Sequence, residues 1–139
     1  MPKEDYIEKH LNQMSRALGK VLFNAMGDSN EGQIKLSVEL LEQKIEEVLD
    51  LPFEKTIELN NDEFISELIN KRDFNEDNFQ KLADLLFQLA LMNQSQNNQE
   101  KSVRLFKKCL ALYLQVDKTS TVFSFERNQR VKMINKLMK

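Results

Sequence analysis

The sequence has few of the residues that interrupt helices or that build disulfide and metal scaffolds. Its 139 residues include three glycines, two prolines, one cysteine, one histidine and no tryptophan. A single cysteine excludes an intramolecular disulfide and fits a reducing compartment. Three glycines leave little material for a phosphate-binding loop of backbone amides. The scarcity of glycine and proline, beside abundant Leu, Lys, Glu and Gln, favours helices over many short strands.

Long apolar runs are also missing. No run approaches the roughly 20 residues that span a bilayer. The first residues, Met1 to Asp5, show neither the basic nor the apolar part of a signal peptide, so we expect a cytoplasmic protein with no membrane contact. With 41% apolar and 30% charged residues, the composition is that of an ordinary globular protein. The length fits a single domain over residues 1–139.

Apolar residues recur at three- and four-residue steps along most of the chain, which predicts amphipathic helices. The helices are expected at about residues 4–25, 31–50, 61–72, 75–92, 99–116 and from 124 onward. Residues 53–59 are ambiguous between a short helix and an extended connector. No stretch alternates with a period of two, so no sheet is predicted. The prediction is an all-α fold of about six helices, whose short connections favour antiparallel neighbours.

Local signals place several helix ends. Pro52 disfavours the helical conformation just before it, so the second helix is expected to stop near Asp50. Asn60 followed by Glu63 resembles a capping box that opens the third helix. The fourth helix is expected to start at Asp73 or Asn75. It is apolar on most sides, which predicts a central position.

The stretch from residue 82 to residue 116 has the spacing of a tetratricopeptide-type helical hairpin. Leu86 precedes Ala90 by four positions, and Ser102 follows Ala90 by twelve. Phe106 and Cys109 come four and seven positions after Ser102. In the tetratricopeptide repeat, which this stretch resembles, small residues let the paired helices approach and an aromatic side chain fills the gap between them. Tyr113 and Leu114 are both expected to be buried on the second helix of the pair.

Three features depart from that repeat. Asn93 stands where the first helix usually has an aromatic residue, Asn97 replaces the turn glycine, and the closing proline is absent. Asparagine tolerates the left-handed conformation that the turn needs. In the order of its elements, the whole chain is similar to a family of short, uncharacterised bacterial proteins with tetratricopeptide-like folds. The resemblance implies about six antiparallel helices stacked as TPR-like helical hairpins, and it implies no activity.

The resemblance also implies a place for a partner. If the hairpin packs as in tetratricopeptide proteins, one face of the helix at about 75–92 lines a shallow groove. The candidate lining residues recur at three- and four-residue steps and are Asp84, Phe87, Leu91 and Gln94. An apolar contact flanked by polar side chains suits a peptide or a partner helix. The alternative is that the first or the last helix of the chain itself covers Phe87 and Leu91.

Charge is distributed unevenly. Residues 1–100 hold 10 Lys or Arg against 20 Asp or Glu, whereas residues 101–139 hold 10 against 2. The candidate basic patch in this last part consists of Lys101, Arg104, Lys107, Lys108, Arg127, Arg130, Lys132 and Lys136. Three interpretations stay open. The cations pair with the acidic helices of the same chain or of a second copy in a homodimer, they bind an acidic protein, or they bind nucleic-acid phosphates.

No catalytic or metal-binding arrangement is recognisable. His10 lacks partners for acid–base or metal chemistry at helical spacing, and Cys109 lacks an adjacent base. We expect Cys109 to be a buried packing residue. The acidic residues between Glu39 and Asp50 lack the histidine that a di-metal carboxylate site requires, so a solvated face is expected. No cofactor is predicted.

The sequence therefore predicts a non-catalytic protein–protein interaction module for a protein or peptide partner. The alternative is a nucleic-acid-binding regulatory protein that uses the basic C-terminal helices. A third hypothesis, an enzyme built on unrecognised carboxylates, would require a pocket with several acidic side chains of raised pKa.

Overall fold

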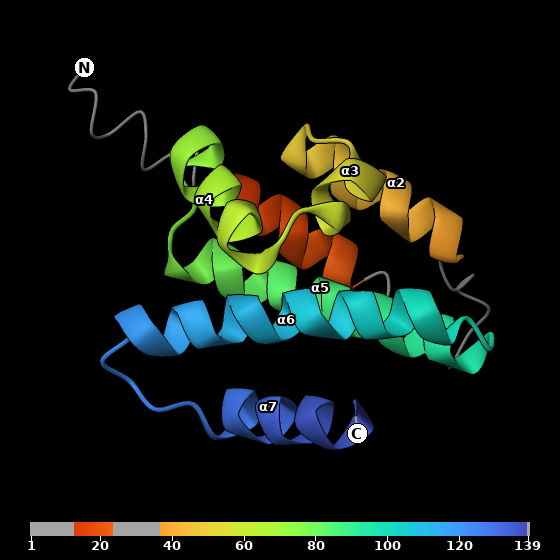
Figure 1. The fold of residues 1–139 in the computed structure, drawn as a ribbon. Coiled ribbons are helices and arrows are strands. Elements are labelled where there is room, and N and C mark those ends of the chain that lie inside the picture. Colours follow the sequence, from red (N-terminus) through yellow and green to blue (C-terminus); the bar gives the residue numbers. More distant parts are fainter. Residues whose placement is uncertain (1–12, 24–36, 139) are drawn as a thin grey trace.

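From residue 37 on, the chain folds into helices joined by short connections (Figure 1). The computed structural model describes residues 13–23 and 37–138. A helix occupies residues 13–23, and the others are α2 (Val38–Leu49), α3 (Phe53–Glu58), α4 (Asn61–Arg72), α5 (Glu76–Ser95), α6 (Gln99–Thr119) and α7 (Phe125–Leu137). The described ranges contain no strand, which confirms the predicted all-α class. The ambiguous stretch after Pro52 is the short helix α3, so residues 13–23 and 37–138 contain seven helices where the sequence predicted about six for the chain.

The helix ends follow local side-chain chemistry. Helix α2 stops at Asp50, which has a left-handed φ of 53° just before Leu51 and Pro52, as predicted. The side chain of Asn60 accepts the N–H of Glu63 at 2.8 Å and opens α4. Of the two expected starts of α5, Asn75 is the cap, and it exchanges hydrogen bonds with Asn78. Asp73 instead ends α4 with a left-handed φ of 52°.

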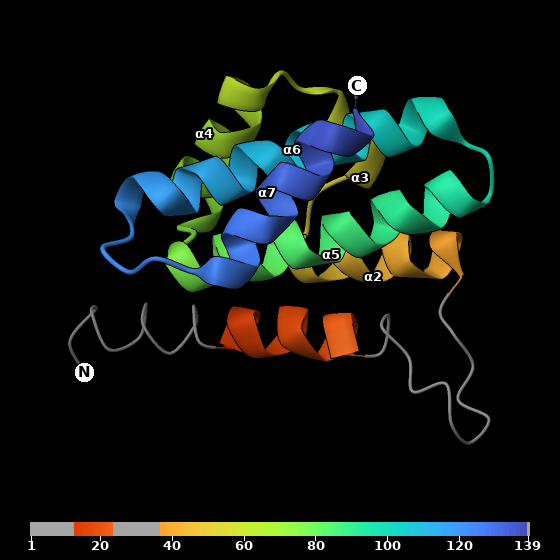
Figure 2. The same cartoon turned by 90° about the horizontal axis from the view of Figure 1, so that it is seen from below.

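Helices α5 and α6 form an antiparallel hairpin at the centre of the molecule. Figure 2 shows α5 between α6 and the helix of residues 13–23, and α2 also packs against α5. Ten of the twenty residues of α5 are buried, in agreement with its apolar surface on most sides. Where the two helices of the hairpin approach, the Ser102 hydroxyl donates to the carbonyl of Ala90 at 2.9 Å. Helices α2, α3 and α4 lie on one side of the hairpin and α7 lies on the other (Figures 1 and 2).

Asparagines build the turn of this hairpin. Asn97 has a φ of 63°, the left-handed conformation in which asparagine substitutes for glycine. The buried side chain of Asn93 donates to the carbonyl of Leu89 at 2.8 Å, and the backbone carbonyl of Asn93 accepts the N–H of Asn98 at 2.9 Å. Asn93 therefore closes the turn by hydrogen bonds instead of filling space with a ring.

One hydrophobic core joins the described helices. Leu41, Leu68, Leu89 and Leu112, from four different helices, are fully buried in it. Each such leucine contributes about 1.5–3 kcal/mol relative to an exposed one. None of the helices that the structure describes combines the length and apolar character needed to cross a membrane. His10 lies outside the described residues.

Candidate functional site

The face of α5 that was predicted to line a partner groove contacts α7 at one end. The carboxylate of Asp84 forms an ion pair with Arg130 of α7 and accepts hydrogen bonds from Tyr113 of α6 and from Gln80. These contacts join α5, α6 and α7 through one carboxyl group. Asp84 is therefore an anchor for the last helix.

Phe87, one turn further along α5, is also covered. Its side chain is only 5% exposed, and its ring packs edge-on against Phe106 with centroids 5.9 Å apart. The guanidinium of Arg130 lies 5.3 Å from the centroid of the Phe87 ring. Leu91 and Gln94, on the same face of α5, are half-buried. A partner can reach Phe87 only if α7 leaves this position.

Burial and charge together set the pKa values in this cluster. Burial raises the pKa of the Asp84 carboxyl, and the hydrogen bond from Tyr113 and the charge of Arg130 only partly offset it. Burial and the nearby charge of Asp84 raise the pKa of the Tyr113 phenol, which therefore keeps its proton and donates it. Burial alone would lower the pKa of Arg130, but Tyr113 and Asp84 leave it raised. Asp84 of α5 and Tyr113 of α6 thus bind the charged guanidinium of Arg130 and hold α7 against both helices.

Four of the eight cations in the candidate basic patch are ion-paired within the chain. Lys101 of α6 forms ion pairs with Glu42 of α2 and Glu54 of α3, two helices that precede α6 in the chain. Burial lowers the pKa of the Lys101 ammonium, but these two glutamates more than compensate and raise it. Arg104 pairs with Glu100 at 3.0 Å, one turn before it on α6. Arg130 pairs with Asp84 and, at 3.3 Å, with Glu126.

Arg127 is almost fully buried and ties the start of α7 to the rest of the molecule. Its Nε lies 2.5 Å from the carboxylate of Asp117. Its guanidinium also donates to Gln80 of α5 and to the carbonyl of Val122. A guanidinium with this many acceptors serves the fold and has little capacity left for a phosphate.

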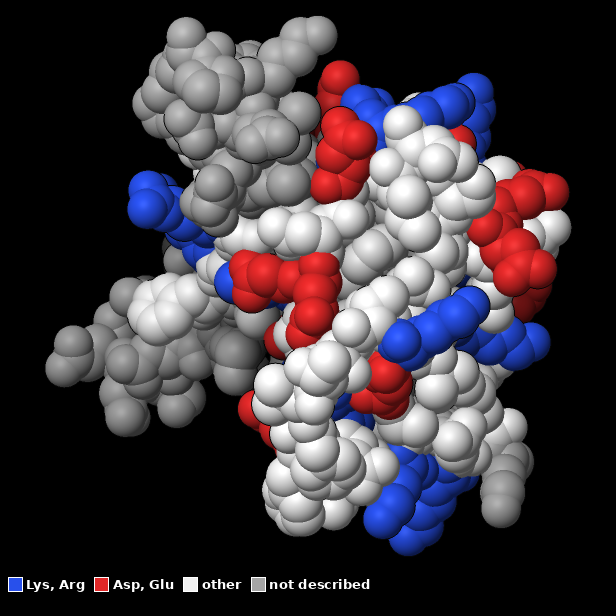
Figure 3. Space-filling view, turned by 90° about the vertical axis from the view of Figure 1, so that its left-hand side faces the viewer, with Lys and Arg blue, Asp and Glu red and all other residues white. Residues whose placement is uncertain are grey.

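The other cations of the patch divide into one buried and three exposed residues. Lys108 is buried, lies 5.7 Å from the centroid of the Phe64 ring and donates to Asn61 at 3.0 Å. Burial and the neighbouring charge of Lys107 lower its pKa. Lys107, Lys132 and Lys136 are exposed and form no ion pair within residues 13–23 and 37–138. On the face that Figure 3 shows, basic side chains are separated by acidic and uncharged ones.

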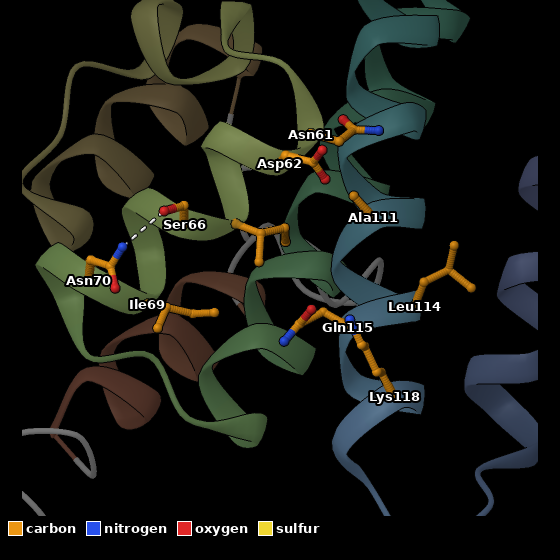
Figure 4. A pocket seen from close by; sticks show the side chains of 10 residues that line it. Asn61, Asp62, Ser66, Ile69, Asn70, Ala111, Leu114, Gln115 and Lys118 are labelled. Atoms are coloured by element: carbon orange, nitrogen blue, oxygen red, sulfur yellow. Dashed lines mark hydrogen bonds between the residues drawn. The ribbon is translucent and has the colours of Figure 1, made fainter.

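An open groove of about 550 Å³ lies between α4 and α6 (Figure 4). Its lining residues come from both helices and are Asn61, Asp62, Ile65, Ser66, Ile69, Asn70, Ala111, Leu114, Gln115 and Lys118. Two of them, Ile69 and Leu114, are large apolar side chains that are 41% and 51% exposed. We name this feature the α4–α6 groove.

The exposure of Leu114 corrects the expectation that it is buried with Tyr113. Leu112 and Tyr113 are both buried, and the helix turns by about 100° per residue, so the next side chain, Leu114, points out of the core. Tyr113 faces the core and Leu114 faces the groove. The groove itself was not predicted, because it depends on how α4 packs against a helix about fifty residues later.

A second apolar feature was also missed, the segment that leads from α6 into the first residue of α7. Val122, Phe123 and Phe125 are 71%, 74% and 68% exposed. The backbone of this segment is nevertheless held, because the Ser120 hydroxyl bonds both the N–H and the carbonyl of Val122 at 3.1 Å. We name residues 122–125 the apolar segment.

The described residues offer no arrangement for metal or thiol chemistry. No group of three or more His, Cys, Asp or Glu side chains could hold a metal ion in the part of the chain that the structure describes. Cys109 is buried, as predicted, and burial raises its pKa well above the usual range. On α2, Glu39, Glu46 and Glu47 are exposed to solvent, as expected, whereas Glu42 is half-buried and pairs with Lys101, so the acidic face is not solvated throughout.

No protein-family model, curated protein or solved structure matches this chain. The resemblance to tetratricopeptide proteins stays a prediction from the sequence.

Proposed function

We propose that this chain is a non-catalytic, cytoplasmic protein–protein interaction module of tetratricopeptide-like architecture, and that it binds a polypeptide in the α4–α6 groove. The observation that carries the proposal is the exposure of Ile69 and Leu114, which line one open groove from two different helices. Large apolar side chains exposed at a concave surface are typical of polypeptide-binding sites.

The chemistry of the groove suits a polypeptide. Ile65 and Ala111 add apolar surface to the same groove. The amide groups of Asn61, Asn70 and Gln115 lie along the same groove and can donate to or accept from a peptide backbone or polar side chains. An amphipathic helix or an extended segment with apolar side chains would be held by this combination.

The walls of the groove are fixed before any partner binds. Lys108 of α6 donates to Asn61 at the first turn of α4, and its ammonium lies over the Phe64 ring. Phe64 and Leu68, which do not line the groove, are buried on α4 and fix that helix to the core. A preformed site lowers the entropy lost on binding.

The tetratricopeptide-like architecture is supported by the central hairpin. Small residues meet where α5 and α6 approach, as in the hydrogen bond from Ser102 to Ala90, and Asn97 adopts the left-handed turn conformation. Stacked helical hairpins commonly serve as binding scaffolds, since they present extended surfaces made of several helices.

The alternative, a nucleic-acid-binding regulatory protein, is supported by Lys132 and Lys136, which are exposed one turn apart on α7, and by Lys107 on α6. Three exposed lysines can attract phosphates with a shallow salt dependence. Four of the other cations are ion-paired and Lys108 is buried, which leaves this surface weakly basic, so we place this alternative second.

The proposal is tested by affinity capture from cell lysate with and without nuclease. Leu114→Asp should lose the captured protein, because a charge in the groove opposes burial of an apolar side chain. Leu40→Asp is the matched control, since Leu40 is also an exposed leucine but lies on α2 outside the groove. If both variants captured the protein equally well, the result would contradict the proposal that the partner binds in the groove.

The same experiment addresses the alternative. Suppose that the captured material is lost after nuclease treatment and is also lost with the double variant Lys132→Glu, Lys136→Glu. This result would support nucleic acid as the partner in place of a protein. Circular dichroism of each variant confirms that the fold is kept, as expected for exposed positions.

A further inference from the structure

We infer that the groove binds a second copy of this chain: the apolar segment of each copy docks in the α4–α6 groove of the other. The inference rests on the proposed function of the groove and names its partner. A single contact between copies would then cover both the apolar segment and the α4–α6 groove.

The apolar segment is the most exposed cluster of large apolar side chains in the described residues. Val122, Phe123 and Phe125 are each about 70% exposed within four positions. Single exposed apolar residues are common on protein surfaces, but a cluster that includes two phenylalanines marks a contact surface. Something of complementary shape and apolar character should cover it.

The α4–α6 groove has that complementary character. It is concave, it presents Ile69 and Leu114 at its surface, and its volume of about 550 Å³ can receive aromatic side chains. Its ten lining residues include one carboxylate, Asp62, and one ammonium, Lys118, so their charges cancel. Residues 121–125, Thr-Val-Phe-Ser-Phe, carry no charge. Docking of this uncharged segment in the groove therefore meets no net charge on the groove lining.

A chain cannot place its apolar segment in its own groove. The segment leads from α6 to α7, and α7 lies on the other side of α6 from α4 (Figures 1 and 4). Only Ser120 and Thr121 separate the end of α6 from Val122. The chain therefore turns away from its own groove directly after the helix that forms one wall of it.

A second copy can satisfy both features at once. Lys118, the last groove residue on α6, precedes Val122 by one short linker, so groove and segment are neighbours at one end of the molecule. A two-fold axis near this end brings each segment to the partner's groove and gives two equivalent contacts. An interface of this kind is closed, so it ends at a dimer.

The segment is also held ready for docking. Ser120 bonds both backbone groups of Val122, and Arg127 donates to the same carbonyl at 3.2 Å. Less conformational entropy is lost when a segment that is already fixed enters an interface.

The test is a reciprocal pair of charge substitutions followed by analytical ultracentrifugation. Wild type should be in concentration-dependent equilibrium with a dimer. Leu114→Lys in the groove and Phe123→Glu in the segment should each weaken self-association by about tenfold or more. Leu40→Lys on α2 is the control and should associate like wild type.

Mixing the two variants should restore a dimer that contains one chain of each. In the mixed dimer one contact is the native pair, and the other places the new glutamate beside the new lysine. A dimer formed through segment–segment or groove–groove contact would not recover in this way. Raising the salt concentration should leave the wild-type dimer intact, because the contact is apolar, whereas a dimer held by acidic and basic surfaces would dissociate.

Two results would overturn the inference. One is a wild-type chain that stays monomeric at every concentration at which it remains in solution. The other is a dimer that survives both substitutions, or whose variants fail to recover on mixing. If wild type is monomeric while Leu114→Asp still loses a captured protein, the groove function stands and the second copy is not its partner.

Discussion

The guanidinium of Arg130 lies 5.3 Å above the Phe87 ring, so a cation of the last helix rests on an aromatic side chain of the central helix. The same guanidinium pairs with Asp84, one turn earlier on α5. Helix α7 buries only Arg127 and Ile134. Its attachment therefore depends on arginine contacts more than on an apolar stripe.

Arg130→Ala should loosen α7 without unfolding the central hairpin. The substitution removes an ion pair, a hydrogen-bonded phenol contact and a cation–π contact, and we expect the free energy of local opening of α7 to fall by about 1–3 kcal/mol. Amide hydrogen exchange should become faster in residues 125–137 and stay unchanged in α5. Lys132→Ala, which alters an exposed cation of the same helix, should change neither. If hydrogen exchange became equally faster in all helices, the result would contradict the proposal that Arg130 attaches α7 locally.

Phe87→Ala should destabilise the whole molecule by about 3–5 kcal/mol, because it removes a buried ring and leaves a cavity beside Phe106. Phe125→Ala deletes the same side chain at an exposed site and should change the free energy of unfolding by no more than about 0.5 kcal/mol. Urea denaturation of the two variants gives the comparison. Equal effects would contradict the burial of the Phe87 ring.

The pH dependence of stability should report the raised pKa of Asp84. Because burial raises this pKa in the folded state, the folded protein holds the proton more tightly than the unfolded chain does. The contribution of Asp84 to stability is therefore fully present below the usual value of 3.8 and falls as the pH rises through the folded-state value. The free energy of unfolding of wild type, relative to Asp84→Asn, should decrease over this range. An increase with pH would show that the pair with Arg130 outweighs burial.

The thiol of Cys109 should be unreactive while the chain is folded. It is buried, and its raised pKa disfavours the thiolate, which is the reacting form. A disulfide reagent at pH 8 should react rapidly in denaturant and only as fast as the protein opens in buffer. Rapid reaction of the folded chain would contradict its burial.

The sequence predicted features that depend on neighbouring residues. Asn60 and Asn75 begin helices because a short polar side chain can bond the free N–H groups of the first turn, and this chemistry is visible in the sequence. The burial of half of α5 follows in the same way from its apolar residues on most sides.

Features that depend on distant residues were not predictable in this way. Whether Tyr113 or Leu114 faces the core depends on where α4 and α5 lie around α6. The basic residues looked like one patch because they are close in sequence, yet Lys101 meets acidic residues from two earlier helices. The cover over Phe87 comes from Arg130, which lies more than forty residues later.

The central hairpin also has a consequence for the order of folding. Helices α5 and α6 are joined by a turn of three residues, so the loop that closes on their pairing is short and its entropy cost is small. Helices α2, α3 and α4 pack against this hairpin but precede it in the chain. On the ribosome, these three helices emerge before the surface that they cover, so their packing has to wait until α5 and α6 have been synthesised.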